Sequence, residues 1–437
     1  MKNKPILRYY WLALAAILIV ALTACSANIF DSRADSKSNT VESDKPRVQI
    51  DEIPLEDLVL LSQGNSDFSM DLYQQMRSEP GNLFFSPYSI SAALAMTYAG
   101  AESQTAEEMQ STLHFLLADQ SLHPAFNALD RHLAELADAE SPDDISDPFQ
   151  LTIANAIWGQ KDFHFESSFL DTLAENYGAG LRLLDYITQP EESRLTINNW
   201  ISEKTREKIR DLIPQGAIDN DTRLVLSNAI YFKATWMEPF EKDLTEEGIF
   251  HGLNREEIPV QMMKGGPDAS LRYYHAPDFQ VVELPYIGGQ VSMLVLMPDE
   301  GKFVDIESVM SSYVLNEILG EMAYSPVRLT FPKFEYEAEL SLARMLSAMG
   351  MPTAFSDAAD FSGMTGSREL FISDVFHKAY VNVDEEGTEA AAATAVVMSV
   401  TSMPENPIEL TVDRPFLFFI REHETNSILF MGRVVSP

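Results

Sequence analysis

Helical spacing of apolar side chains marks several segments of this chain. Apolar residues three and four positions apart predict amphipathic helices over residues 68–76 and 342–349, and Gly350 should stop the second. Thr105 and Glu108 fit a capping box, which predicts that a further helix begins at Thr105. These segments alternate irregularly with strand signals.

Strand signals are clearest in the second half of the sequence. Alternating segments 280–286 and 290–298 flank two glycines, and segments 416–421 and 428–435 flank a short polar turn. Each pair predicts a β-hairpin. Helices followed by many strands predict an α+β domain with mainly antiparallel sheets.

One stretch, Lys378–Ser402, is built more specifically than the rest. It begins as an alternating strand, passes three acidic residues to Gly387, and continues as small and β-branched side chains. Such a segment can stand as a loop or enter a sheet, because no bulky side chain resists entry. An alanine-rich helix starting at Gly387 is the alternative on local propensity. At a period of two, one face of this run contains Thr388, Ala390, Ala392, Thr394 and Val396.

The N-terminus has the pattern of an export signal. Three basic residues precede the apolar segment 9–22, which is shorter than the roughly 20 residues that a membrane-spanning helix needs. The residues before Cys25 resemble the lipobox of bacterial lipoproteins, which implies cleavage before Cys25 and acylation of this residue. An ordinary signal peptide is the alternative. Cys25 is the only cysteine, so no intramolecular disulfide can form.

These features divide the chain into three parts. Residues 1–24 are expected to be the signal peptide, and residues 25–51, which are polar, a lipidated flexible tether. Residues 52–437 contain no second linker and no internal repeat, and should form one domain. The expected location is extracytoplasmic, either anchored by lipid to a bacterial cell membrane or secreted at the cell surface.

Charge limits the classes of binding partner. The formal net charge is −35, and removal of the basic signal makes the mature chain still more acidic. Such a surface repels nucleic acid and anionic lipid headgroups, so neither is an expected partner. Solubility is a sufficient reason for the acidity.

Common catalytic motifs are absent from the sequence. It has no G-x-S-x-G elbow, no glycine-rich phosphate loop and no H-E-x-x-H zinc pattern. An Asp-Asn-Asp run at 219–221 lacks the glycine and glutamate of a calcium loop. No cofactor or metal is therefore expected, although a dispersed Ser-His-Asp site stays open at this point.

Two motifs resemble the serpin family of conformational protease inhibitors. The sequence EEGTEAAAAT (385–394) is similar to the hinge of the serpin reactive-centre loop, and DRPFLFFIRE (413–422) is similar to the strand that follows that loop. The resemblance covers about residue 60 to the end. It implies the serpin fold, with helices packed on three mainly antiparallel β-sheets and an exposed reactive-centre loop.

The resemblance also assigns roles to single residues. Matching segments place the shutter beneath the main sheet at Ser86, Ser89, Asn228 and His377. They place the breach, at the point where the loop enters the sheet, at Trp236, Lys333 and Glu385. The hinge residues are then Glu385, Gly387, Thr388, Ala390, Ala392 and Thr394.

The serpin mechanism implies a suicide substrate that is cut in its loop, traps the protease as an acyl-enzyme and inserts the loop into the main sheet. Spacing from the hinge places the scissile bond at Thr401-Ser402, with Met398, Val400 and Met403 as alternatives. The expected target is a serine or a cysteine endopeptidase with a small or medium apolar pocket, elastase-like in preference.

The expected inhibitor is a monomer that requires no cofactor and is not an enzyme. Two other functional classes stay open on the sequence. One is a non-inhibitory serpin that acts as a chaperone or carries a small ligand. The other is a surface adhesin or structural lipoprotein.

Overall fold

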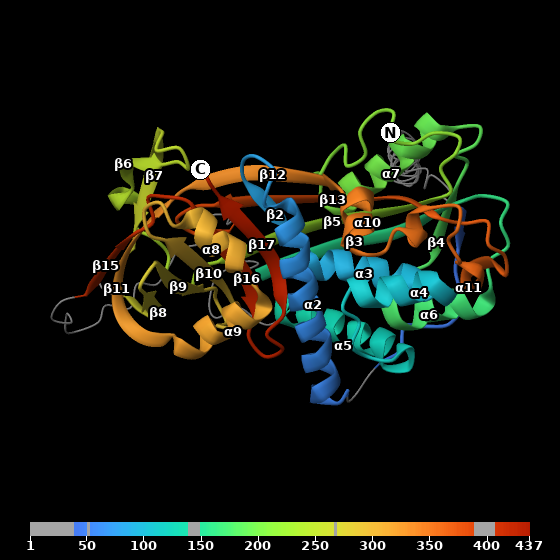
Figure 1. The fold of residues 1–437 in the computed structure, drawn as a ribbon, viewed down its shortest axis with the longest axis horizontal. Helices are drawn as coiled ribbons and strands as arrows, with labels where there is room; N and C mark the ends of the chain where they lie inside the picture. Colours follow the sequence, from blue (N-terminus) through green and yellow to red (C-terminus); the bar gives the residue numbers. More distant parts are fainter. Residues whose placement is uncertain (1–38, 50–52, 139–148, 266–268, 389–406) are drawn as a thin grey trace, which may run out of the picture. The chain divides into compact units, whose positions relative to one another are not determined.

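The computed structural model describes residues 39–49, 53–138, 149–265, 269–388 and 407–437 (Figure 1). The chain separates into two units, Met1–Thr40 and Val41–Pro437, and the architecture below is that of the second unit. Strand β1 (Asn39–Val41) spans the boundary. Among the helices of the described residues, none is long and apolar enough to cross a membrane. Cys25 and the signal segment lie outside the described residues.

Helices are concentrated in the first half of the second unit. They are α2 (Leu55–Met76), α3 (Pro87–Tyr98), α4 (Ser103–Thr112), α5 (Asp119–Asp138), α6 (Ser167–Tyr177), α7 (Pro190–Lys204), η1 (Lys242–Leu244), α8 (Phe303–Val309), α9 (Ser312–Glu321), α10 (Ala343–Met349), η2 (Thr353–Phe355) and α11 (Ser362–Thr365). The two predicted amphipathic helices are confirmed. The apolar face of α2 is buried at Phe68, Leu72 and Met76, and α10 ends at Gly350, whose φ of 137° suits glycine.

In the part of the chain that the structure describes, the strands form two hydrogen-bonded sheets. The first contains β3 (Phe149–Gln160), β4 (Leu181–Leu184), β5 (Leu224–Thr235), β12 (Phe334–Ser341), β13 (Ile372–Val383) and β14 (Gly387–Thr388). The second contains β2 (Leu83–Phe85), β6 (Glu246–His251), β7 (Glu257–Lys264), β8 (Ala269–Ala276), β9 (Phe279–Pro285), β10 (Val291–Pro298), β11 (Ala323–Pro332), β15 (Ile408–Thr411), β16 (Phe416–Glu422) and β17 (Ile428–Val434). Within the second unit the first sheet has the order β4-β3-β5-β14-β13-β12.

The α+β class and the two predicted hairpins are confirmed. The hairpins are β9–β10 and β16–β17, and both pairs are antiparallel. Two of the three expected sheets are joined into one, because β11 pairs with β8 along one part of its length and with β7 along another. Most pairs in both sheets are antiparallel, as expected.

The capping-box prediction at Thr105 is wrong. Helix α4 begins two residues earlier, at Ser103, and Thr105 is buried inside the helix. The Thr105 hydroxyl accepts a hydrogen bond from the backbone N–H of Asp360 at 2.9 Å, and Glu108 accepts two from Thr353. Both side chains therefore form hydrogen bonds with a segment about 250 residues away in the sequence and do not cap the helix.

Strand β5 lies at the centre of the first sheet and has two apolar faces. Leu226 and Ile230 join the core cluster that includes α3, whereas Val225 and Ala229 join a second cluster that includes α7. Side chains alternate across a strand, so the even-numbered positions of β5 point toward α3. Asn228 is one of these positions, which brings its polar side chain to the helix that carries Ser89.

The pairing of β5 with β13 is parallel, unlike most pairs in the structure. It runs from Ile372 opposite Leu224 to Tyr380 opposite Tyr231. Beyond this point the short strand β14 lies between the two, antiparallel to both of them. The β5–β13 seam is thus closed at one end and already holds an additional strand at the other.

Candidate functional site

The hinge occupies the open end of the seam. Gly387 is opposite Thr235 of β5, and Thr388 is opposite both Ala234 of β5 and Val383 of β13. Thr388 is 1% exposed. Thr388, which the resemblance assigns to the hinge, is therefore already paired with both strands of the seam. The later hinge positions, Ala390, Ala392 and Thr394, lie outside the described residues.

Gly387 is required by close approach to β5. A Cβ atom at this position would lie 2.0 Å from the carbonyl oxygen of Ala234, which no side chain can accommodate. Conformational freedom at a hinge would be a general reason for a glycine here. The structure gives a more specific reason, which is that the hinge backbone packs directly on the backbone of β5.

Two consecutive glutamates hold the hinge to neighbouring elements. The Glu385 carboxylate accepts hydrogen bonds from Lys333 Nζ and Thr245 Oγ1, both at 2.7 Å. Burial alone would raise the pKa of Glu385, but these two hydrogen bonds lower it below its ordinary value. Glu386 binds Lys242, and this hydrogen bond raises the pKa of the lysine. The hinge entrance is therefore a charged, partly exposed site.

A stacked pair of aromatic residues forms hydrogen bonds with the hinge. Trp236 and Tyr286 stack with their ring centroids 4.5 Å apart and their planes 7° apart. The indole N–H of Trp236 donates to the carbonyl oxygen of Asp384 at 3.0 Å. The hydroxyl groups of Tyr286 and Thr388 form a buried hydrogen bond of 2.7 Å. Both side chains are thus hydrogen-bonded to the hinge segment 384–388.

The four predicted shutter residues come together near the middle of the seam. His377 of β13 is opposite Asn228 of β5, and the His377 Nδ1 and Asn228 Oδ1 atoms are hydrogen-bonded. The backbone N–H of Ser86 donates to His377 Nε2 at 3.2 Å, so Nε2 is the acceptor and Nδ1 carries the proton. Asn228 Nδ2 donates to Ser89 Oγ at 2.6 Å. The hydrogen bonds thus link both strands of the seam to α3.

Burial determines the charge of the shutter. Ser86, Ser89, Asn228 and His377 are each 0% exposed. Loss of water lowers the pKa of His377 to about 3, so the ring is neutral at physiological pH. A neutral imidazole with both nitrogens hydrogen-bonded holds two strands together without an ionic interaction.

Three residues of these sites were not predicted from the sequence. Asn155 of β3 accepts a hydrogen bond from Ser89 Oγ at 3.2 Å and another from Asn228 Nδ2. Tyr286 and Lys242 contact the hinge as described above. Asn155 had one signal, since it is a polar residue between two alanines, within the apolar run from Ile153 to Trp158. The reactive-bond residues Thr401 and Ser402 lie outside the described residues.

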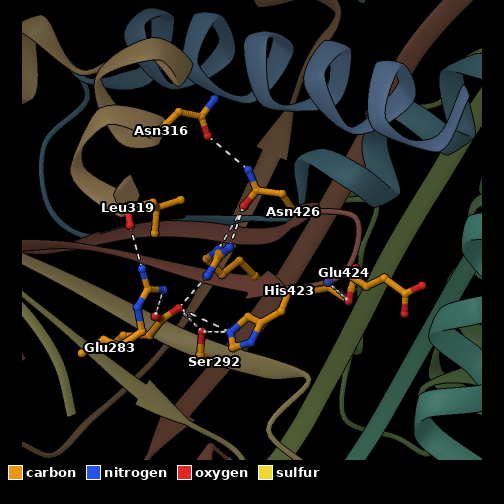
Figure 2. Close-up of polar contacts among 10 residues, drawn as sticks. Glu283, Ser292, Asn316, Leu319, His423, Glu424 and Asn426 are labelled. Atoms are coloured by element: carbon orange, nitrogen blue, oxygen red, sulfur yellow. Dashed lines mark hydrogen bonds and ion pairs between the residues drawn. The ribbon is translucent and has the colours of Figure 1, made fainter. Parts of the chain in front are cut away.

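A separate polar cluster in the second sheet contains a serine, a histidine and a glutamate (Figure 2). Glu283 of β9 is 3% exposed and binds Arg421 and Arg272, each at 2.6 Å. Burial would raise the pKa of Glu283, but the histidine and the two arginines hold it well below its ordinary value. The Ser292 hydroxyl lies 2.6 Å from Glu283 Oε1 and 2.8 Å from His423 Nε2.

The geometry of this cluster excludes a catalytic triad there. A triad needs the histidine to contact serine through one ring nitrogen and the carboxylate through the other. Here the same atom, His423 Nε2, lies near both Ser292 and Glu283. Ser292 also donates its proton to the glutamate and is 0% exposed. The cluster instead connects β8, β9, β10 and β16 by buried hydrogen bonds and ion pairs.

Within the described ranges, no group of three or more His, Cys, Asp and Glu side chains is arranged to hold a metal ion. The hinge and the shutter described above both lie on the β5–β13 seam.

Comparison of the sequence with protein families gives a match over residues 63–437 to the family described as serpin (serine protease inhibitor). An uncharacterized serpin-like protein of Thermococcus kodakarensis is 35% identical over 434 residues, covering 97% of this chain and 98% of that protein. Human serpin B4 is 40% identical and the leukocyte elastase inhibitor of Xenopus laevis 38%, each covering 86% of this chain and 99% of the relative.

Solved structures agree with this match. The native state of tengpin, a thermophilic serpin, has a TM-score of 0.78 at 28% identity, covering 91% of this chain and 98% of that one. Human thyroxine-binding globulin in complex with its hormone has a TM-score of 0.77 at 30% identity, covering 87% and 99% of the two chains.

Proposed function

Because this chain belongs to the serpin family, we propose that it inhibits an endopeptidase as a suicide substrate by inserting its cut loop into the β5–β13 seam. The observation that carries this proposal is the position of Thr388. The hinge already forms the first residues of a strand that is antiparallel to both β5 and β13. Continued insertion in the same register needs no change of direction.

The pairing change supplies a driving force for insertion. Parallel pairs are slightly less stable per residue than antiparallel ones. An inserted strand replaces the parallel β5–β13 pairing with two antiparallel pairings. Each added hydrogen bond contributes about 0.5–1.5 kcal/mol net, so a strand of some ten residues gains many kcal/mol. The uncut form is then metastable and persists for kinetic reasons.

The protease reaction connects cleavage to this driving force. The catalytic nucleophile attacks the carbonyl carbon of Thr401, the peptide bond to Ser402 breaks, and the protease keeps the Thr401 acyl group. The released end of the loop then enters the seam and carries the protease with it before water hydrolyses the acyl bond. Residues 390–403 contain no Lys or Arg, which favours an elastase-like target over a trypsin-like one.

Incubation with a panel of elastase-like and trypsin-like proteases tests the proposal. We expect a complex that survives SDS denaturation with an elastase-like serine protease, and its mass should equal the protease plus the inhibitor without its C-terminal peptide, which SDS releases. Complete cleavage of the loop with no such complex, across serine and cysteine proteases, would contradict the proposal. Mass spectrometry of the released C-terminal peptide distinguishes cleavage after Thr401 from cleavage after Met398, Val400 or Met403.

A small-ligand carrier is the second candidate function. The observation that favours it is the similarity to human thyroxine-binding globulin, which was solved with its hormone bound. The small side chains of the hinge favour inhibition, because a carrier has no need of a segment able to enter a sheet. A carrier would be cut in the loop without retaining the protease.

We also propose that Cys25 anchors the protein by lipid to the outside of a bacterial cell membrane, on the basis of the lipobox resemblance. Cys25→Ala should abolish labelling by a radioactive fatty acid and release the chain from membranes, with inhibition unchanged. Mature wild-type chain that retains Cys25 without any label would contradict this anchor.

A further inference from the structure

Residues Ser43–Gln49, here named the arm, connect two helices of the domain. The Lys45 ammonium lies 3.0 Å from both Asp171 and Glu175 of α6. Ser43 donates to Asp171 at 2.5 Å, and the backbone N–H of Val48 donates to the carbonyl oxygen of Glu175 at 2.8 Å. This part of the sequence was expected to belong to a flexible tether. The structure instead packs the arm along α6.

Arg47 makes the contacts to α5. Its Nε atom donates to Asn127 Oδ1 at 2.7 Å, and its Nη2 atom binds Asp130 at 2.7 Å. Asn127 is 0% exposed and returns a hydrogen bond to the carbonyl oxygen of Val48 at 3.0 Å. Loss of Arg47 would therefore leave the side-chain carbonyl of a buried amide without this donor, which is costly. The arm thus ties α5 to α6.

A cavity of about 250 Å³ lies beneath Arg47. Arg47 and Asp130 line it on the side of the arm, and Ile153 and Asn155 line it from β3. Asn155 is the residue that accepts a hydrogen bond from the shutter residue Asn228. The arm and the shutter therefore contact the same cavity.

Movement of β3 would alter this cavity. Strand β3 pairs with β5 from Phe149 opposite Ala234 to Gly159 opposite Leu224, so β3 must follow when β5 separates from β13. Ile153 and Asn155 line the cavity from β3, so a shift of this strand changes the shape of the cavity. Fixing the helices around it restricts that shift, because a closely packed wall transmits strain.

We propose that the arm is a positioning element that holds α5 and α6 against β3, keeping the shutter closed until the loop is cut. Arg47 is the residue on which this restraint depends. The inference rests on the proposed function, since it concerns the same loop insertion. Without the arm, the uncut loop enters the sheet earlier, and the protein loses its inhibitory form spontaneously.

The full-length chain tests this with two arm variants. Fresh protein is held at elevated temperature, and conversion to an inserted, uncut form is followed by its resistance to urea on gradient gels. We expect Arg47→Ala to shorten the half-life of conversion about tenfold, which corresponds to about 1.4 kcal/mol in the barrier. Lys45→Ala is the matched control. Its side chain is 48% exposed, against 28% for Arg47, so its ion pairs contribute little and the half-life should change less than twofold.

A half-life for Arg47→Ala within twofold of the wild-type value would overturn the inference. If Arg47→Ala fails to fold, Asp130→Asn removes the ionic contact from the other side and should shorten the half-life about threefold, while an unchanged half-life would again overturn it. The gel assay needs no protease, whereas SDS-stable complexes of fresh wild-type protein test the proposed function. The two failures are therefore distinguishable.

Discussion

The hinge and the shutter hold the same β5–β13 seam by different interactions. At the hinge, Glu385 and Glu386 pair with lysines, and the lysine side chains are 36% and 62% exposed. At the shutter, Asn228 and His377 are fully buried and neutral. Salt and competing ions reach the hinge and not the shutter. If the loop inserts as we propose, the end that receives it is held partly by solvent-exposed ion pairs, whereas the middle is held by buried, neutral hydrogen bonds.

Cleavage of the loop should change the stability of the protein more than any of the substitutions below. We expect limited cleavage near Thr401 to raise the thermal midpoint by tens of degrees, because insertion replaces both sets of contacts with a full strand. A thermal melt before and after cleavage measures it. Nicking an ordinary loop loosens a fold, so an unchanged or lower midpoint would show that the seam does not accept the loop.

A charged substitution at Thr388 should prevent the hinge from pairing with β5 and β13. Thr388 is buried between β5 and β13, so Thr388→Arg would place a charge in the sheet interior at a cost of several kcal/mol. The variant should fold, be cut as a substrate and form no stable complex. Its thermal midpoint should also fail to rise after cleavage. A Thr388→Arg variant that traps protease as the wild type does would contradict loop entry at this position.

The shutter should respond to pH through His377. Its pKa is about 3 in the folded chain against an ordinary value of 6.5, so the unfolded state binds an additional proton between these values. The free energy of unfolding therefore falls as the pH is lowered below 6.5. Relative to His377→Gln, the wild type should lose about 2 kcal/mol between pH 7 and pH 5, measured by urea unfolding. A pH-independent difference would show that the imidazole is not neutral and buried.

The hydrogen bond between the Tyr286 and Thr388 hydroxyl groups should contribute less to the free energy of unfolding. Tyr286→Phe and Thr388→Val each remove one side of a buried hydrogen bond and should each destabilise the uncut protein by about 1 kcal/mol. Together they should cost less than the sum of the two. Tyr336→Phe is the control, because its hydroxyl binds backbone carbonyls elsewhere. Strict additivity in the double-mutant cycle would show that the two hydroxyls are not coupled.

The ion pair of Lys242 should have the smallest effect. The lysine is largely exposed, so Lys242→Gln should change the free energy of unfolding by only a few tenths of a kcal/mol, and the change should diminish in high salt. Lys264→Gln, which removes another exposed pair, is the control. A large, salt-independent loss at Lys242 would mean that the hinge is held as rigidly as the shutter.

Local sequence patterns predicted the secondary structure better than the contacts of the site. Periodicity identified α2, α10 and both hairpins, because a long apolar face is a local signal. The capping box at Thr105 failed because Asp360 and Thr353 compete for the same side chains. The contact of Tyr286 with Thr388 spans 102 residues and has no local signal.

The resemblance to serpins assigned residues that are distant in the sequence to one shutter and one hinge. Residue spacing alone could not have predicted these groups. The resemblance did not identify Asn155, Lys242 or the arm. The arm is polar, and polar segments without apolar periodicity are predicted to be flexible. Its order depends on Asn127 and Asp171, whose availability only the packed helices determine.

The position of the arm also bears on mechanical load. Residues 43–49 precede α2 in the chain, so a pull on the N-terminus passes through them before it reaches α2. The hydrogen bonds and the ion pair of Arg47 with α5, together with the backbone hydrogen bond from Val48 to α6, would then resist the force by shear. A pull on the N-terminus would thus be absorbed before it reaches the β5–β13 seam, and only a force large enough to release the arm would act on this seam.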